Sequence, residues 1–330
     1  MEEKFRNALE GIFVCPKTKK GLNLVFENNQ LVSLKNNEVT YSAKDGVISF
    51  VSGKNYVSNF GDQWLKFRKT QLDSFNGSTL SEDRFFGSTG WSRAEIQGKL
   101  ILDVGCGAGR FAEIALKHGA YVIAIDYSES VYAAYENLKS YPNFLVLKAN
   151  IYELPFLKQS FDYIYSLGVL QHTPDPEKAF KCLPQLLKLN GSICVDYYWK
   201  RFREIFKTKY YVRLVTRFFN ENQIYNFLFK HHSSLYKISN AMSSIPVFGK
   251  FFIFLVPVKN YKFDYPELND KQLEEWSFLD TYDNWAPMYD KPQTKSKILK
   301  FAQDEMLDNI ELLHAGHLVL RAKKKEHQLI

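Results

Sequence analysis

The sequence predicts an α/β protein built on a doubly wound, mostly parallel sheet. Three observations indicate this class. Strand-like apolar segments alternate with helix-like segments from Leu100 onward, a glycine-rich turn follows the first of these strands, and 330 residues suffice for one such sheet with additions. Hydrophobic residues make up 45% of the chain and charged residues 24%, as in globular proteins, which disfavours extensive disorder and coiled coil.

Residues 1–57 predict a small, separate β-rich module. Its short strand-like segments are divided by turns of Asn, Lys and Gly and lie at 21–26, 30–34, 38–41 and 47–51. Residues 58–99 follow as a polar and aromatic connector, for which short helices are predicted.

Residues 100–199 carry the regular alternation that defines the core. Strands are predicted at 100–104, 121–126, 144–148, 161–167 and 192–197, and helices at 110–118, 129–140 and 176–189. Pro184 should kink or interrupt the last of these helices, because proline lacks the backbone N–H that a helix interior uses.

The rest of the chain predicts a helical insertion at 200–290 and the end of the sheet at 291–330. A helix at 294–304 precedes two closing strands at 310–315 and 317–322. Because the junction of these strands is short enough for a hairpin, the seven-stranded sheet should end with an antiparallel strand.

The net charge of +7 is distributed unevenly. Between Lys200 and Lys262, twelve basic residues stand against two acidic ones, so the rest of the chain carries about −3. Phenylalanines are interleaved with the basic residues, among them Phe206, Phe218, Phe219, Phe227 and Phe229. The pattern fits an amphipathic surface that contacts anionic lipid or a lipid-linked acceptor, and the alternative is a homodimer interface or a simple lid.

Targeting and redox signals indicate a cytoplasmic protein. The first residues, MEEKFRNALEG, are charged where a secretory signal would need an apolar segment. The longest apolar run, at 251–258, is far shorter than the about 20 residues that span a bilayer. A peripheral membrane contact through residues 200–262 stays open. The four cysteines show no CxxC spacing, which predicts reduced thiols and no metal site.

The glycine-rich turn after the first core strand predicts a ligand site. Gly105, Gly107 and Gly109 allow both a tight turn and close approach of a ligand to the main chain. A dinucleotide fingerprint would need Gly or Ala at position 110, where this chain has Arg110. Asp126 ends the second core strand, where a carboxylate can accept hydrogen bonds from both hydroxyls of a ribose. The pattern favours an adenosine ligand without a pyrophosphate.

Five motifs together resemble the class I S-adenosylmethionine-dependent methyltransferases. In chain order they are DVGCGAGR at 103–110, IDYS at 125–128, NIYELPF at 150–156, FDYIYSLGVLQH at 161–172 and LNGSI at 189–193. Their order and spacing match the family over roughly residues 60–322. The resemblance implies a Rossmann-like fold, a methyl-transfer activity and S-adenosylmethionine as the cofactor.

The resemblance also implies which residues bind the cofactor. They are Asp103, Gly105, Gly107, Gly109, Arg110, Asp126, Tyr127, Asn150, Ile151 and Leu167. Asp103 and the glycine turn would hold the methionine portion, Asp126 the ribose, and Asn150 with Ile151 the adenine, while Leu167 would lie under the sulfonium. Asn150 stands where the family commonly has Asp, but its side-chain oxygen can still accept a hydrogen bond. Arg110 is either a salt-bridge partner on its helix or a contact of the cofactor carboxylate.

Two narrower resemblances concern the acceptor and the N-terminus. FGDQW at 60–64, the segment 90–111 and DTYDNWAPMYDKPQT at 280–294 resemble bacterial methyltransferases encoded with surface-polysaccharide or small-molecule biosynthesis, whose aromatic segments cover the cofactor and shape the acceptor site. Residues 1–57 resemble the zinc-ribbon-like domain that precedes some of these enzymes. It would be degenerate and metal-free, because Thr18 stands where a second Cys would follow Cys15.

We therefore expect methyl transfer to a small-molecule, glycan or lipid-linked acceptor. Much of the catalysis can come from holding nucleophile, methyl carbon and leaving sulfur in line. If the acceptor must lose a proton, His172 is the first candidate base and Asp196 the second, with a structural role as the alternative for His172. The other functional classes are an RNA methyltransferase, although no RNA-binding module is recognisable, and a non-catalytic cofactor-binding scaffold. Nucleic acid is not expected as a partner.

Overall fold

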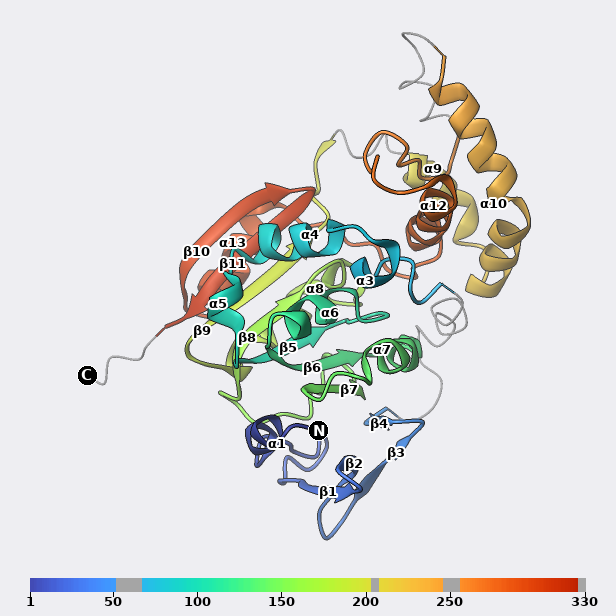
Figure 1. Ribbon diagram of the computed structural model, residues 1–330. Coiled ribbons are helices and arrows are strands. Elements are labelled where there is room, and N and C mark those ends of the chain that lie inside the picture. Colours follow the sequence, from blue (N-terminus) through green and yellow to red (C-terminus); the bar gives the residue numbers. More distant parts are fainter. Residues whose placement is uncertain (52–66, 203–207, 246–255, 326–330) are drawn as a thin grey trace. The chain divides into compact units, whose positions relative to one another are not determined.

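The chain divides into two compact units. Unit 1 comprises residues 1–68, 79–199 and 291–330, and unit 2 comprises residues 69–78 and 200–290. The computed structural model describes residues 1–51, 67–202, 208–245 and 256–325 of the chain (Figure 1).

The described part of unit 1 is built around a sheet of eleven strands. Their spatial order is β1-β2-β3-β4-β7-β6-β5-β8-β9-β11-β10. The strands are β1 (Asn23–Glu27), β2 (Gln30–Lys35), β3 (Thr40–Lys44), β4 (Val47–Ser49), β5 (Leu100–Val104), β6 (Tyr121–Asp126), β7 (Phe144–Lys148), β8 (Phe161–Ser166), β9 (Leu187–Tyr197), β10 (Leu307–Ala315) and β11 (His317–Lys324). The helices are α1 (Glu3–Leu9), α4 (Leu80–Thr89), α5 (Arg93–Ile96), α6 (Arg110–Lys117), α7 (Ser130–Leu138), α8 (Pro176–Lys181) and α13 (Lys295–Asp304).

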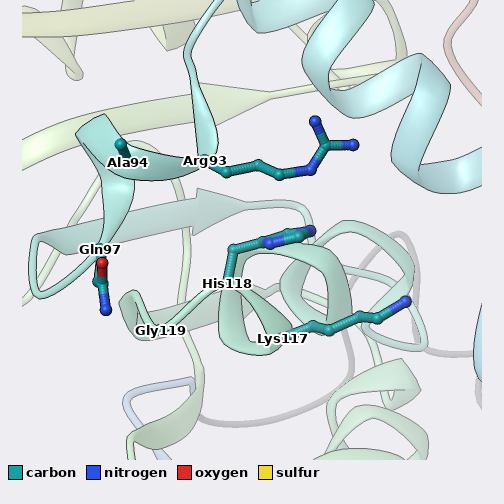
Figure 2. Close-up of a pocket in the computed structure, with 6 residues that line it drawn as sticks. All are labelled: Arg93, Ala94, Gln97, Lys117, His118 and Gly119. Carbon is teal, nitrogen blue, oxygen red and sulfur yellow. The ribbon is translucent and has the colours of Figure 1, made fainter.

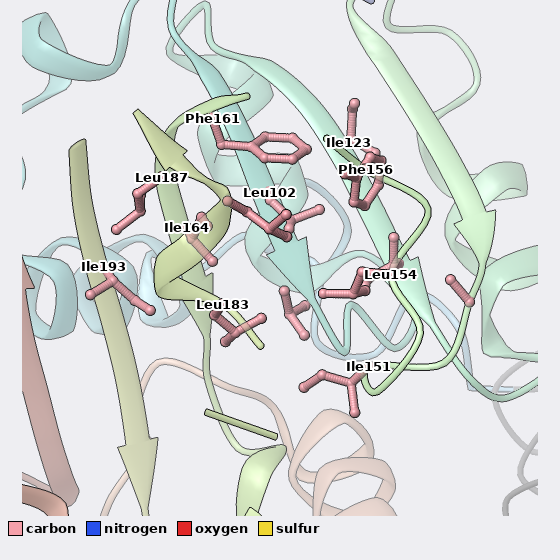
Figure 3. Packing of buried hydrophobic residues seen from close by; sticks show 14 of the residues in the cluster. Leu102, Ile123, Ile151, Leu154, Phe156, Phe161, Ile164, Leu183, Leu187 and Ile193 are labelled. Atoms are coloured by element: carbon pink, nitrogen blue, oxygen red, sulfur yellow. The ribbon is translucent and has the colours of Figure 1, made fainter. Parts of the chain in front are cut away.

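Helices cover both faces of this sheet, and neighbouring positions on one strand enter separate cores. Leu102 and Ile123 belong to the core that includes α1, α8 and α13, whereas Ile101 and Val122 belong to the core that includes α4, α6 and α7. Figure 3 shows the first of these cores, where side chains of β8 and β9 join those of β5 and β6. Strand β5 is buried at every position, as expected of a parallel strand covered on both faces.

The core strands and the closing hairpin follow the prediction. Pro184 interrupts the predicted helix as expected, because α8 already ends at Lys181 and a 3-10 turn begins at the proline. Strand β9 consequently starts at Leu187, five residues earlier than predicted. Ala315 pairs with His317 in the hairpin, and β11 lies antiparallel between β9 and β10.

The N-terminal residues correct the expectation of a separate module. Strand β4 pairs in parallel with β7, with Ile48 opposite Leu147. The side chains of Phe5, Leu9 and Phe13 are buried in the same core as the central strands. The predicted seven strands therefore form one part of a larger sheet, which β1 to β4 extend at one edge.

Unit 2 is helical in its described part, as predicted for the insertion. Its helices are α3 (Asp73–Asn76), α9 (Thr208–Thr216), α10 (Glu221–Ser243) and α12 (Asp270–Trp285). Helices α10 and α12 both begin with a capping box, formed by Asn220 with Gln223 and by Asn269 with Gln272. Phe206, the motif at 60–64 and most of the apolar run at 251–258 lie outside the described residues.

Candidate functional site

The predicted cofactor residues lie at one edge of the sheet in unit 1. Strands β7, β6, β5 and β8 are neighbours and run parallel, so their carboxyl ends at Lys148, Asp126, Val104 and Ser166 meet at that edge. The loops that follow these strands carry the predicted residues from Gly105 onward. In open α/β sheets this edge is where ligands bind.

The turn after β5 is fixed to both neighbouring strands. Its main-chain N–H groups at Gly105 and Cys106 donate to Ile125 O of β6, at 2.8 and 3.0 Å. Gly105 has a φ of +82°, and a Cβ added there would lie 2.4 Å from Val169 Cγ2, in the loop after β8. Glycine is therefore required at this position for both its conformation and the close packing of two site loops.

Asp126 connects the glycine turn to the end of β6. Its Oδ2 accepts from Gly107 N at 3.0 Å, and its Oδ1 accepts from Ser128 N and Ser128 Oγ, both at 2.8 Å. A carboxylate offers about four acceptor positions, so three donors leave one for a ribose hydroxyl, whereas the sequence predicted contacts with both hydroxyls. The side chain is held in a fixed orientation at the place where the sequence predicts a ribose contact.

Asp103 is the buried carboxyl group of the site. Its side-chain Oδ2 is buried and makes no hydrogen bond within the described part of the chain. Burial raises the pKa of Asp103 to about 8, with the charge of Asp126 adding to the rise and the hydroxyl group of Tyr165 acting in the other direction. A cationic group would supply the missing partner and favour the ionised form. The residue therefore fits the ammonium group of the cofactor's methionine portion.

The other predicted cofactor residues line the same edge. Asn150 Oδ1 accepts from Tyr152 N at 3.1 Å, while Ile151 and Leu167 are 8% and 6% exposed. Tyr127, next to Asp126, is half-buried. Apolar and largely buried side chains at these places fit the enclosure of an adenosine.

Arg110, at the start of α6, contacts α4. Its Nε donates to Ser81 Oγ at 2.9 Å, and its guanidinium lies 5.0 Å from the ring centroid of Phe111. The sequence left a salt bridge and a cofactor contact open for this residue. The bond to Ser81 adds a third interaction that the sequence did not predict.

Asp196, the second candidate base, is buried in an ion pair. Its Oδ2 lies 3.1 Å from Arg84 Nη2 of α4, its Oδ1 accepts from Gly168 N in the loop after β8, and its side chain is only 1% exposed. A carboxylate with these partners is fixed in position, which favours a positioning role. Sequence reasoning missed Arg84, because 112 positions separate it from Asp196 and no motif connects them.

His172 follows β8 in a 3-10 turn and lies against an aromatic ring. Its imidazole centroid is 5.3 Å from that of Tyr198, at the end of β9, with the rings nearly perpendicular. The Tyr198 ring in turn stacks on His317 of β11, also at 5.3 Å. Three rings from separate segments thus form a row at this edge.

A cavity of about 490 Å³ lies elsewhere on unit 1, near the start of β6 (Figure 2). It is lined by Arg93, Ala94, Gln97, Lys117, His118 and Gly119. Three of these side chains surround Glu82 of α4, whose carboxylate lies 2.7 Å from Arg93 Nη2, 3.0 Å from His118 Nε2 and 3.6 Å from Lys117 Nζ. Burial acts to raise the pKa of Glu82, but these partners outweigh it, and the pKa is lowered. The charges are thus part of an ion-pair cluster.

The described residues contain neither a cluster of metal ligands nor a membrane-spanning helix. Among them, no group of three or more His, Cys, Asp or Glu side chains could hold a metal ion. Cys15 Sγ lies 3.3 Å from Tyr41 Oη. Likewise, none of the described helices is long and apolar enough to cross a membrane.

The fold and the site fit a domain that binds a nucleoside cofactor, and the sequence comparisons specify the class for part of the chain. Residues 102–195 match the family described as methyltransferase domain. A ubiquinone biosynthesis O-methyltransferase of Coxiella burnetii (strain Dugway 5J108-111) is 35% identical over 101 residues, which cover 30% of this chain and 43% of that protein. Phosphoethanolamine N-methyltransferase 2 of Caenorhabditis elegans is 33% identical over 113 residues, which cover 32% of this chain and 25% of that protein.

A solved structure from Methanococcus maripaludis, described as an S-adenosylmethionine-dependent methyltransferase, shares 13% identity with a TM-score of 0.46, covering 85% of this chain and 99% of that chain. The chain spans less than half the length of the curated relatives named above. For residues 102–195, the family match confirms the predicted class, a methyltransferase domain with S-adenosylmethionine as its cofactor.

Proposed function

We propose that the whole chain transfers a methyl group from S-adenosylmethionine to a small-molecule, glycan or lipid-linked acceptor. The observation that carries this proposal is Asp103, a buried carboxyl group with an unpartnered oxygen beside the glycine turn. It lies within the segment that matches the methyltransferase domain. The cofactor supplies the methyl group, on a sulfonium that is already a good electrophile.

The residues of unit 1 would hold this cofactor in three parts. Asp103 and the turn at 105–109 would bind the methionine portion, Asp126 the ribose, and Asn150 with Ile151 the adenine. The three donors on Asp126 support this assignment, because they fix the carboxylate before any ligand arrives.

The ion pair of Arg84 and Asp196 would position the loop after β8. Asp196 holds Gly168 N, and the next residue, Val169, packs on the glycine turn at Gly105. Side chains held in this way keep the reacting groups aligned and exclude water, which is the main contribution that a transfer from an activated methyl donor requires. We therefore assign Asp196 a positioning role in place of a base.

His172 is the proposed base for an acceptor that must lose a proton. The names of the relatives include both an O- and an N-methyltransferase, so they leave the acceptor atom open. A hydroxyl acceptor would need a base, and histidine is the side chain that most often takes this role. The contact with Tyr198 supports the proposal because it restricts the orientation of the ring.

The test follows a labelled methyl group from the cofactor into fractionated small-molecule, glycan and lipid extracts. Label should enter one fraction, and His172→Ala should lower the rate by about 10²- to 10⁴-fold without changing cofactor affinity. His314→Ala, which alters an exposed histidine, is the control. A rate within a few-fold of wild type would make His172 structural. Cofactor binding without label in any fraction would indicate a scaffold instead of an enzyme.

We further propose that residues 1–57 are a metal-free relative of a zinc ribbon. The support is the absence of a second Cys near Cys15 in the sequence and the contribution of Phe5 and Phe13 to the core of unit 1. Elemental analysis giving about one zinc per chain would refute this.

A further inference from the structure

Helix α9 of unit 2 carries its apolar side chains on an exposed face. Tyr211, Leu214 and Val215, with Phe218 in the turn that follows, recur at the i, i+3, i+4, i+7 spacing of a single helical stripe. These residues are 54%, 57%, 60% and 75% exposed, respectively. A helix of a globular protein ordinarily buries such a stripe, so α9 is oriented the other way round.

The polar side chains of α9 make its contacts within unit 2. Lys209 Nζ lies 3.1 Å from Asp290 Oδ2, and these side chains are only 13% and 6% exposed. Arg213 Nη2 and Thr216 Oγ1 donate to carbonyl oxygens within residues 285–287, at 2.8 and 3.0 Å. Because Lys209, Arg213 and Thr216 recur at i, i+4, i+7, the polar face is directed inward by specific bonds.

Exposed apolar residues are concentrated in this region. Of the sixteen large hydrophobic residues that are exposed in the described part of the chain, ten lie between Phe202 and Ile245. Helix α10 contributes Phe227 and Ile238, which are 50% and 51% exposed. Such a concentration of exposed apolar side chains marks an interaction surface, since scattered single residues would need no explanation.

The exposed part of this region is basic. Residues 208–245 contain five Lys and Arg side chains, of which Lys209 and Arg213 are directed inward, and a single acidic residue, Glu221. Arg217 is exposed, and its guanidinium lies 4.8 Å from the ring centroid of Phe218, so cation and apolar stripe are adjacent. Lys230 and Lys237 are exposed on α10.

We propose that the α9 surface, formed by Tyr211, Leu214, Val215, Arg217 and Phe218, binds the anionic surface of a lipid bilayer. Aromatic and aliphatic residues beside cations are the composition of helices that lie in the membrane interface. With nine residues, α9 is far shorter than the about 20 that span a bilayer, so the contact is peripheral.

The charge of the region favours an anionic bilayer over a second copy of the chain as the partner of the α9 surface. A self-complementary interface through the α9 surface would bring two basic regions together, and like charges at close range oppose association. An anionic bilayer satisfies both the apolar stripe and the basic side chains. The proposal does not depend on methyl transfer, because it concerns unit 2, whereas the cofactor residues lie in unit 1.

The experiment is sedimentation of the full chain with vesicles of phosphatidylcholine containing phosphatidylglycerol, and with phosphatidylcholine alone. Binding should require the anionic lipid and should weaken as NaCl is raised towards about 0.5 M. Leu214→Asp and Phe218→Asp should each weaken vesicle binding by about tenfold or more, since each removes an apolar side chain from the contact. Arg217→Gln should weaken it by about fivefold.

Leu157→Asp is the matched control, because Leu157 is a leucine of unit 1 that is 46% exposed. It should bind vesicles as wild type does. Each variant is also tested for cofactor binding, which should be unchanged, so that a failure here is distinct from a failure of the proposed function. No association with anionic vesicles at low salt would overturn the proposal. The proposal would also be overturned if Leu214→Asp still bound vesicles as wild type does but no longer formed dimers. The same holds if that variant bound vesicles normally but had lost binding to RNA.

Discussion

Asp103 shows how one side chain of the proposed site opposes the stability of the fold. Its carboxyl group is buried with an unpartnered oxygen, and its pKa is raised to about 8. A raised folded-state pKa means that the protonated form favours the fold, so stability is present below the unfolded pKa of about 4 and is lost as the pH rises towards 8. A residue that lowers the stability of the ligand-free protein and fits a cationic ligand is typical of a binding site.

We therefore predict that Asp103→Asn stabilises the ligand-free protein while weakening cofactor binding. Relative to wild type, the gain in free energy of unfolding should be about 2 to 3 kcal/mol larger at pH 7 than at pH 5. Denaturant unfolding at both pH values measures this difference. Asp308→Asn, at an exposed carboxylate of β10, is the control and should show no such change. An equal effect at both pH values would mean that Asp103 is ionised in the fold.

His232 of α10 predicts the opposite dependence on pH. The residue is 2% exposed, and burial lowers its pKa to about 4, although Glu274 nearby acts in the other direction. Its Nε2 lies 2.9 Å from Ser277 Oγ, whose own proton is donated to Lys259 O. The ring is therefore a neutral donor. A lowered folded-state pKa gives stability that is present above the unfolded pKa of about 6.5 and is lost as the pH falls towards 4.

We predict that this group alone lowers the free energy of unfolding by about 2 kcal/mol between pH 7 and pH 5. His232→Gln should remove that part of the pH dependence, whereas His314→Gln, at an exposed histidine, should keep it. The measurements are thermal and urea unfolding of the full chain at both pH values. If His232→Gln and wild type lose stability in parallel, His232 is not held neutral in the fold.

Between elements, the ion pair of Arg84 and Asp196 connects α4, β9 and the loop after β8. Asp196 is 1% exposed, so removing its partner leaves a buried, uncompensated charge. We predict that Arg84→Ala lowers the free energy of unfolding by about 2 to 4 kcal/mol, somewhat less than for a fully buried pair because the arginine is 29% exposed. Arg84→Ala should also weaken cofactor binding, because Asp196, which accepts the hydrogen bond from Gly168 N, is then no longer fixed by the arginine.

The double variant Arg84→Ala with Asp196→Asn separates positioning from general instability. Neutralising the buried carboxylate should recover part of the stability lost in Arg84→Ala. A double variant that is as unstable as the sum of both single changes would contradict the assigned ion pair.

Local patterns in the sequence predicted the elements well, but not their distant contacts. The alternation of apolar segments, Pro184 and the short junction at Ala315 predicted the core strands, the broken helix and the hairpin, because these depend on neighbouring residues. The pairing of Ile48 with Leu147 joins segments about a hundred positions apart, and no local pattern encodes it. The exposure of the apolar stripe on α9 likewise depends on distant contacts, namely the polar bonds of Lys209 and Arg213.

At the scale of the whole molecule, the two proposals concern different units. Unit 1 contains the sheet, both cores and every predicted cofactor residue from Asp103 to Leu167. Unit 2 contains the basic and aromatic helices. The glycine turn and Asp126 could be predicted as cofactor residues from the sequence, because a site for a nucleoside cofactor needs fixed residue types at fixed spacing; their role stays a prediction. The acceptor site has no such signature, since catalysis by alignment needs no particular residue type.

Titration calorimetry with the full chain tests the central claim most directly. The wild-type protein should bind S-adenosylmethionine and S-adenosylhomocysteine with similar affinity, and NAD and ATP far more weakly. Asp126→Ala should weaken binding by about tenfold or more, since a hydrogen bond to a charged group contributes about 1.5 to 3 kcal/mol. Asp308→Asn should bind as wild type does. Absence of S-adenosylmethionine binding in the wild type, or unchanged binding in Asp126→Ala, would contradict the account.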